Sequence, residues 1–157
     1  MEKLILTKQG TEILRKRLAE LQREFAEISR IKTETAENAG DLWHDNPAFD
    51  EIAAKQRMMI YEMDKIKRQL EAAEVIDPAV VRGRSKVAVG STAEISINKG
   101  RPKKIILSDP VAANPARGLI SYQSPLGSAI LGAKVNELRS YQIGGKEFKV
   151  QIIGILQ

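Results

Sequence analysis

Two stretches of the chain, LRKRLAELQREFAEI at residues 14–28 and IAAKQRMMIYEMDKIKRQL at residues 52–70, decide the fold of its first half. In each stretch, residues spaced alternately four and three apart form one seam, which is the spacing of a coiled coil. The seam residues of the first stretch are Leu14, Leu18, Leu21, Phe25 and Ile28, and those of the second are Ile52, Gln56, Met59, Met63, Ile66 and Leu70. All are apolar except Gln56, which we interpret as a residue that fixes the register.

The two seams are mirror images about position 42. Leu18 pairs with Ile66, and Leu21 with Met63, about this same midpoint. The arms of an antiparallel helical hairpin must present facing layers, and two independent helices would have no reason to match in this way. The sequence therefore predicts a hairpin, with Leu18 facing Ile66.

Turn residues lie where this hairpin requires them. Gly40 can end the first helix in a left-handed conformation, and Asn46-Pro47 can cap and begin the second. Thr7 is placed to cap the first helix. We expect an arm from Thr7 to Asn38, and a second helix that ends at Asp77-Pro78.

Charge is distributed unevenly along the chain. Its net charge is +5, with 25 Lys and Arg against 20 Asp and Glu. Residues 1–76 hold 13 basic and 15 acidic residues, and residues 77–157 hold 12 and 5, so the halves carry −2 and +7. From Thr33 to Ala54 there are six acids and no Lys or Arg: Glu34, Glu37, Asp41, Asp45, Asp50 and Glu51. Charge blocks of this kind concern partners more than fold.

Beyond a linker at Arg82–Ser85, the apolar period changes to that of strands. Ala93, Ile95 and Ile97 alternate with polar residues, and three further β-rich runs follow at 103–108, 118–122 and 148–156. Gly144-Gly145 is a hairpin signal, and Ser124-Pro125 opens a short helix. We predict an α+β protein, with a helical hairpin at 1–76 and a domain of about five antiparallel strands and one helix at 77–157.

Composition excludes several classes of protein. The chain has no cysteine and one histidine, His44, so neither a disulfide framework nor a zinc site is expected. No stretch approaches the roughly 20 apolar residues of a membrane helix. We therefore expect a soluble cytoplasmic protein that does not contact a membrane.

Short motifs along the whole chain resemble those of the bacterial transcript-cleavage factors GreA and GreB. They are Leu6-Thr7 with Gly10, Gly40-Asp41-Leu42 followed by Asp45-Asn46, Val75-Ile76-Asp77, and Ile120-Ser121-Tyr122-Gln123-Ser124-Pro125 with Leu131-Gly132. The resemblance implies an FKBP-like fold for the C-terminal domain. Because residues 77–157 contain only three aromatic residues, we do not interpret that domain as a prolyl isomerase.

The resemblance also implies a mechanism. The C-terminal domain would dock on RNA polymerase through Ser124, Pro125 and Leu126, and the hairpin would enter the secondary channel. Asp41 and Asp45 would then share a Mg²⁺ ion with the polymerase active centre and assist hydrolysis of backtracked RNA. The expected protein is a monomeric accessory factor with no enzymatic activity of its own.

Other residues receive supporting roles from the same resemblance. Leu42, Trp43, His44 and Asn46 would make contacts at the tip of the hairpin. Arg15, Lys55 and Arg57 would contact RNA near its 3′ end within the complex. From the residues alone, the alternatives are that Asp41 is a turn residue, Asp45 a helix-dipole residue, and the basic residues a solvated face.

The tip departs from the family pattern. Trp43 and His44 stand between Leu42 and Asp45, where the family has a single residue, and the second acid is Asp rather than Glu. One alternative is therefore a Gre-like paralogue that occupies the channel and inhibits polymerase without cleavage. An alternative of another class is a coiled-coil chaperone or adaptor that does not act on polymerase.

Overall fold

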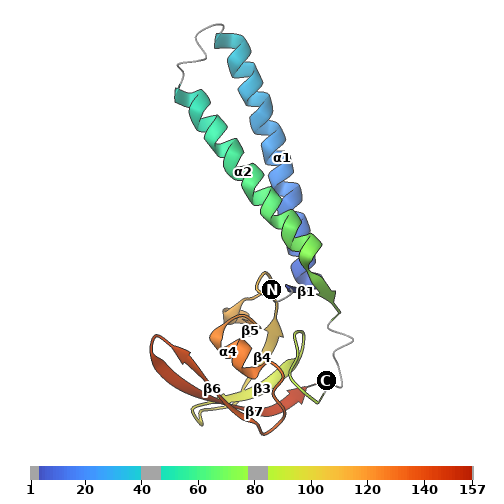
Figure 1. The fold of residues 1–157 in the computed structure, drawn as a ribbon, viewed down its shortest axis with the longest axis vertical. Helices are drawn as coiled ribbons and strands as arrows, with labels where there is room; N and C mark the ends of the chain where they lie inside the picture. Colours follow the sequence, from blue (N-terminus) through green and yellow to red (C-terminus); the bar gives the residue numbers. More distant parts are fainter. Residues whose placement is uncertain (1–3, 40–46, 78–84, 157) are drawn as a thin grey trace. The chain divides into compact units, whose positions relative to one another are not determined.

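The computed structural model describes residues 4–39, 47–77 and 85–156. The chain divides into two compact units, one formed by residues 1–13 and 73–157 and the other by residues 14–72. Helix α1 runs from Lys8 to Ala39 and helix α2 from Pro47 to Ala72 (Figure 1). In the part of the chain that the structure describes, no helix is both long and apolar enough to cross a membrane.

The two helices form an antiparallel pair. Arg17 Nε lies 3.0 Å from Glu62 Oε1, and Lys55 Nζ lies 2.9 Å from Glu24 Oε1. Partner numbers on α2 therefore fall as those on α1 rise. On the predicted seam, Gln56 Nε2 donates to Ser29 Oγ at 2.9 Å, and Gln56 Oε1 accepts from Lys32 Nζ at 3.3 Å. The mirror about position 42 pairs Gln56 with Ile28, and the contact with Ser29 is one residue from that pairing.

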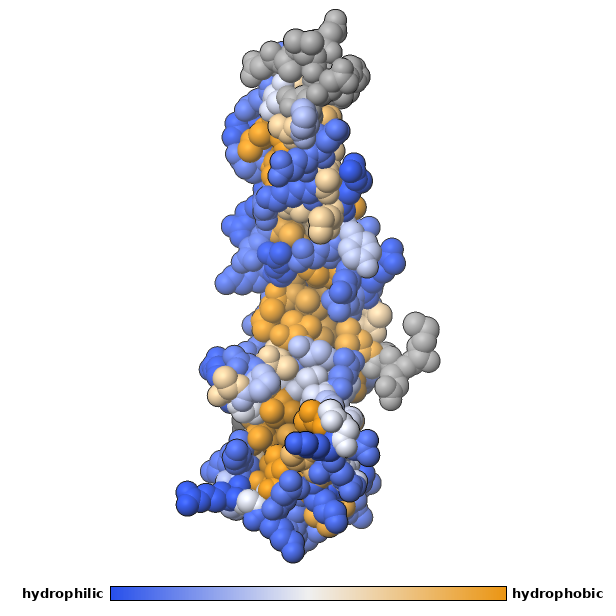
Figure 2. All heavy atoms as spheres, turned by 90° about the vertical axis from the view of Figure 1, so that its left-hand side faces the viewer, coloured by the Kyte–Doolittle hydropathy of each residue, from blue (hydrophilic) through white to orange (hydrophobic). Residues whose placement is uncertain are grey.

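The predicted seam is the face that the hairpin buries. Leu14, Leu21, Met59 and Ile66 are buried, Leu21 being only 2% exposed, and the other predicted seam residues are all half-buried. Figure 2 shows hydrophobic side chains along one side of the hairpin, bordered by hydrophilic ones. Aliphatic burial thus stabilises the pair, at roughly 25 cal/mol per Å² of apolar surface removed from water.

Helix α2 ends earlier than predicted. Helix α2 stops at Ala72, and β2 (Glu74–Ile76) follows it as a strand paired in parallel with β1 (Ile5–Thr7). The prediction of a helix that ends at Asp77-Pro78 is therefore wrong. Val75 and Ile76 are β-branched, which favours a strand once a partner strand is available. This pairing also groups residues 1–13 with the β-rich unit, whereas the sequence-based division placed them with the hairpin.

The β-rich unit is built on a five-stranded sheet in the order β5-β4-β3-β7-β6. Its strands are β3 (Thr92–Ile97), β4 (Lys103–Ser108), β5 (Leu119–Ser121), β6 (Leu138–Ile143) and β7 (Lys146–Leu156). The pair β4–β5 is parallel, so the prediction of an entirely antiparallel sheet is wrong there. The residues between Ser108 and Leu119, which include a 3₁₀ turn at Pro115–Arg117, return the chain in the same direction.

One short helix, α4 (Pro125–Ile130), contributes to the core of this unit. Ser124 caps it as predicted, since its hydroxyl accepts from the Gly127 N–H at 3.1 Å. Ile130 is fully buried. The core cluster consists of Val87, Ala93, Ile95, Ile105, Leu107, Ile130, Ala133, Val150 and Ile152. The fold class is therefore the predicted one, a helical hairpin followed by a β-rich domain.

Candidate functional site

The acidic segment predicted to be functional, Thr33–Ala54, includes the end of α1, residues 40–46 and the start of α2. Helix α1 ends at Ala39, and α2 begins at Pro47, as predicted from the proline. Six predicted site residues fall outside the described residues: Asp41, Leu42, Trp43, His44, Asp45 and Asn46. The described residues that flank them belong to the end of α1 and the start of α2.

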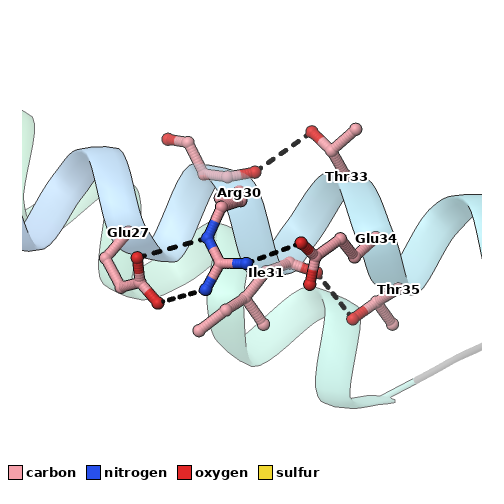
Figure 3. Close-up of polar contacts among 7 residues, drawn as sticks. Glu27, Arg30, Ile31, Thr33, Glu34 and Thr35 are labelled. Carbon is pink, nitrogen blue, oxygen red and sulfur yellow. Dashed lines mark hydrogen bonds and ion pairs between the residues drawn. The ribbon is translucent and has the colours of Figure 1, made fainter.

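Arg30 is engaged by acids of its own helix. Its Nη2 lies 2.6 Å from Glu27 Oε1, and its Nη1 lies 2.7 Å from Glu34 Oε1 (Figure 3). The hydrogen bond from Arg30, reinforced by its charge, holds the pKa of the Glu27 carboxyl below its ordinary value. Glu34 is thus the one described acid of the acidic segment that is paired. The carboxylates of Glu37, Asp50 and Glu51 form no ion pair with any described residue.

Lys32 and Lys55 each contact the facing helix, in the half of the hairpin that leads to residues 40–46. Lys32 Nζ lies 4.7 Å from the centroid of the Phe49 ring and 3.3 Å from Gln56 Oε1. Lys55 is paired with Glu24. The cations nearest in sequence to residues 40–46 therefore all have partners elsewhere. Sequence reasoning missed the Lys32–Phe49 contact, although a lysine on an apolar seam was a signal for it.

The predicted RNA-contacting residues are only partly brought together. Lys55 and Arg57 line a shallow depression of about 560 Å³ on α2, whereas Arg15 lies on α1 and does not line it. The other lining residues are Met58, Met59, Tyr61, Glu62 and Lys65. Met58 and Tyr61 are each 74% exposed, so this face of α2 combines apolar and basic side chains.

The predicted docking segment is held by its own hydrogen bonds. The hydroxyl of Ser124 donates to the Ser121 carbonyl at 2.7 Å while it caps α4. Leu126 packs against the core, and Pro125 is exposed. A Cβ built on Gly127 would lie 1.9 Å from the Ser121 carbonyl oxygen, so only glycine fits there. Pro125 is thus the exposed member of the three, whereas Ser124 and Leu126 are half-buried.

A residue that the sequence analysis did not single out, Asp109, holds the start of α1. It is fully buried and accepts hydrogen bonds from the Thr7 N–H and hydroxyl, and from the N–H groups of Val111 and Ala112 at 2.9 Å. Thr7 Oγ1 in turn accepts from the Gly10 N–H at 3.1 Å, which confirms Thr7 as the cap. The signal for Asp109 was its position as the only acid between residues 95 and 136.

Among the described side chains, no group of three or more His, Cys, Asp or Glu could hold a metal ion. The predicted ligands are Asp41 and Asp45, whose carboxylate oxygens are donors of the kind that Mg²⁺ prefers. Two carboxylates are fewer ligands than this ion requires. The donor set therefore fits a metal site that is completed by another molecule.

Comparison with known proteins gives the family. Residues 82–157 match the family model described as "Transcription elongation factor, GreA/GreB, C-term". Transcription elongation factor GreA of Desulfovibrio desulfuricans is 30% identical over 156 residues, which cover 99% of this chain and 94% of that protein. GreA of Thermomicrobium roseum is 32% identical, with 87% and 86% covered. The chain belongs to the GreA/GreB family of transcription elongation factors.

Solved structures of similar proteins include GreA factor homolog 1 of Thermus thermophilus, at 22% identity and a TM-score of 0.45, which covers 99% of this chain and 100% of that one. A GreA/GreB factor from Nitrosomonas europaea matches at 19% identity and a TM-score of 0.41, with both chains fully covered. The GreA/GreB assignment rests on the sequence relatives. It confirms the resemblance inferred from the motifs.

Proposed function

We propose that this GreA/GreB chain binds RNA polymerase through the secondary channel and stimulates hydrolysis of backtracked RNA at the polymerase active centre. The observation that carries the proposal is the acidic segment, Thr33–Ala54, which holds six acids and no Lys or Arg. The cations nearest in sequence to residues 40–46, Lys32 and Lys55, contact Phe49 and Glu24 respectively. The charge of Asp41 and Asp45 would then act on a partner.

Asp41 and Asp45 would be the residues that hold the shared Mg²⁺. When bound there, the ion would supply Lewis-acid stabilisation of a phosphoryl oxygen and a water of lowered pKa. Since two carboxylates make an incomplete site, the remaining ligands would come from the polymerase. This chain would then be an accessory factor, and the hydrolytic enzyme would be the polymerase.

The length of α1 supports delivery of these acids to a deep site. Its 32 residues extend about 48 Å at 1.5 Å per residue. The seam keeps the two arms together, so the acids are carried at the far end of a stiff pair of helices. Ser124, Pro125 and Leu126 would dock on the polymerase, while Lys55, Arg57 and Arg15 would contact RNA phosphates.

A second function is favoured by the sequence of the tip. The extra residue at Trp43-His44, and Asp45 in place of a longer Glu, move the carboxylates by ångströms, and catalytic positioning does not tolerate such shifts. A factor altered in this way would occupy the channel and inhibit transcription without cleavage.

A transcript-cleavage assay on stalled, backtracked complexes tests the proposal. RNA cleavage should rise with added protein at a fixed polymerase concentration, and a pull-down with core polymerase should show binding in the same range. Binding without cleavage at every Mg²⁺ concentration would support the inhibitory function instead. A failure to bind would support the chaperone or adaptor alternative.

A further inference from the structure

The turn between β3 and β4 carries a dense cluster of cations. Residues 95–108 hold four basic residues and no Asp or Glu: Lys99, Arg101, Lys103 and Lys104. All four are exposed, and none forms an ion pair within the described ranges of the chain. Glu94 lies directly across from Lys104 in the β3–β4 pairing, and partly compensates that one lysine. The charges of the other three remain available to a partner.

The backbone of this turn is fixed. Asn98 and Lys99 have φ values of 49° and 57°, and the Gly100 N–H donates to the Ile97 carbonyl at 2.8 Å, which is the pattern of a type I′ turn. Asn98 is joined to β7 twice, because its N–H donates to the Lys149 carbonyl at 2.8 Å and its Oδ1 accepts from the Lys149 N–H at 2.9 Å. The cations are therefore presented on a rigid turn, with the exposed Lys149 beside it.

Lys99 is the second central residue of the type I′ turn, a position at which glycine is strongly preferred. The second central residue of a type I′ turn strongly favours Gly, because a left-handed backbone is unfavourable for residues with a Cβ. The neighbouring Gly100 does not occupy that position. A charged side chain at a strained site is the kind of outlier from which a functional role can be inferred.

The composition of the turn favours a nucleic-acid partner over a protein. No large hydrophobic residue is exposed between residues 98 and 104, which are all described. Protein interfaces depend on buried apolar and aromatic anchors and are depleted in lysine. Phosphate contacts need only cations, and duplex DNA presents a regular array of phosphates, about one charge per 1.7 Å of axis.

We propose that the basic turn, residues 98–104, binds the phosphate backbone of duplex DNA without reading its sequence. Lys99, Arg101 and Lys103 are the contacting residues. This site is separate in sequence from the acidic segment and from the Ser124-Pro125 segment, so it does not depend on the function proposed above.

Fluorescence anisotropy of the full chain with a labelled DNA duplex tests the proposal, measured from about 50 to about 200 mM salt. The triple variant K99Q/R101Q/K103Q should bind at least about ten-fold more weakly at the low end. The slope of log affinity against log salt should fall by about 0.9 for each charge removed. The charge-matched control K16Q/K67Q/R68Q, which alters exposed residues of α1 and α2, should retain most of the binding.

An equal loss of binding in both variants would overturn the proposal, because net charge alone would then explain it. Tighter binding of single-stranded RNA that the same triple variant abolishes would assign the turn to RNA instead. Displacement of the duplex by poly-glutamate at matched charge would assign it to an acidic protein.

The variant Lys99→Gly separates folding from binding. It relieves the left-handed strain and removes one charge, so its Tm should rise while its affinity for the duplex falls. A rise in Tm with unchanged DNA affinity would contradict a role for Lys99, and the triple variant controls for the remaining two cations.

Discussion

The Thr7 hydroxyl donates to the fully buried carboxylate of Asp109, 102 positions away in the sequence, and at the same time accepts the Gly10 N–H that begins α1. One hydroxyl group therefore caps the helix and satisfies a buried charge. The N–H groups of Val111 and Ala112 complete the shell of that carboxylate. This arrangement explains the Leu6-Thr7 and Gly10 motif in physical terms.

Gly10→Ala should destabilise the β-rich unit by about 1–3 kcal/mol, the usual cost of overpacking a closed site. A Cβ at this position would lie 2.5 Å from both oxygens of Asp109, which are held by four donors and cannot move aside cheaply. Urea unfolding measures the change. Gly154→Ala is the control, because nothing lies within 4 Å of its Cβ, and equal losses in the two variants would contradict the account.

Thr7→Val should cost about 2 kcal/mol or more, because it removes a helix cap and leaves a buried carboxylate short of a donor. Thr7→Ser retains the hydroxyl and should recover most of that stability. Thermal unfolding of the two variants side by side gives the comparison. If Thr7→Val and Thr7→Ser were equally stable, the hydroxyl would have no role in the capping of α1.

Phe49→Leu should weaken the hairpin by about 0.5–1 kcal/mol beyond the loss of packing, because it removes the ring that faces Lys32. A double-mutant cycle with Lys32→Met isolates this term. A coupling energy near zero would show that the ammonium group and the ring do not interact. Gln22→Leu, at an exposed position off the seam, should change stability by less than about 0.5 kcal/mol.

Glu137 should titrate below its ordinary pKa of 4.5, because the Lys134 N–H and then Arg139 stabilise its carboxylate. A depressed pKa means that the native state binds fewer protons, so this contribution to stability is present above pH 4.5 and is lost as the pH falls through the lowered pKa. NMR titration of the carboxyl carbon measures it. Arg139→Gln should reduce the depression without abolishing it, and a complete return to 4.5 would assign the whole effect to Arg139.

The hairpin could be predicted from sequence because its information is local and repeated. The seam from Leu14 to Leu70 predicted the buried face, and Thr7, Pro47 and Ser124 predicted helix starts. The β1–β2 pairing could not be predicted, since strands of three residues carry little signal and their partners lie about 70 residues apart.

Within the candidate site, some residues have a local signal in the sequence and others depend on contacts between distant segments. Asp41 and Asp45 are predicted from charge and from the family motif, and they lie outside the described residues. The contact of Lys32 with Phe49 depends on how two helices meet, and the burial of Asp109 depends on a loop that closes on α1. Neither has a local signal in the sequence.

Transcript cleavage on backtracked polymerase complexes should be measured with Asp41→Asn and Asp45→Asn, alongside polymerase affinity. Each change removes a charge and preserves shape, so affinity should hardly change. Cleavage should fall by more than about 100-fold, since loss of an outer-shell partner of a metal alone costs about 10–100-fold. Cleavage by either variant at the wild-type rate, with affinity intact, would contradict the claim that these two carboxylates assist the reaction.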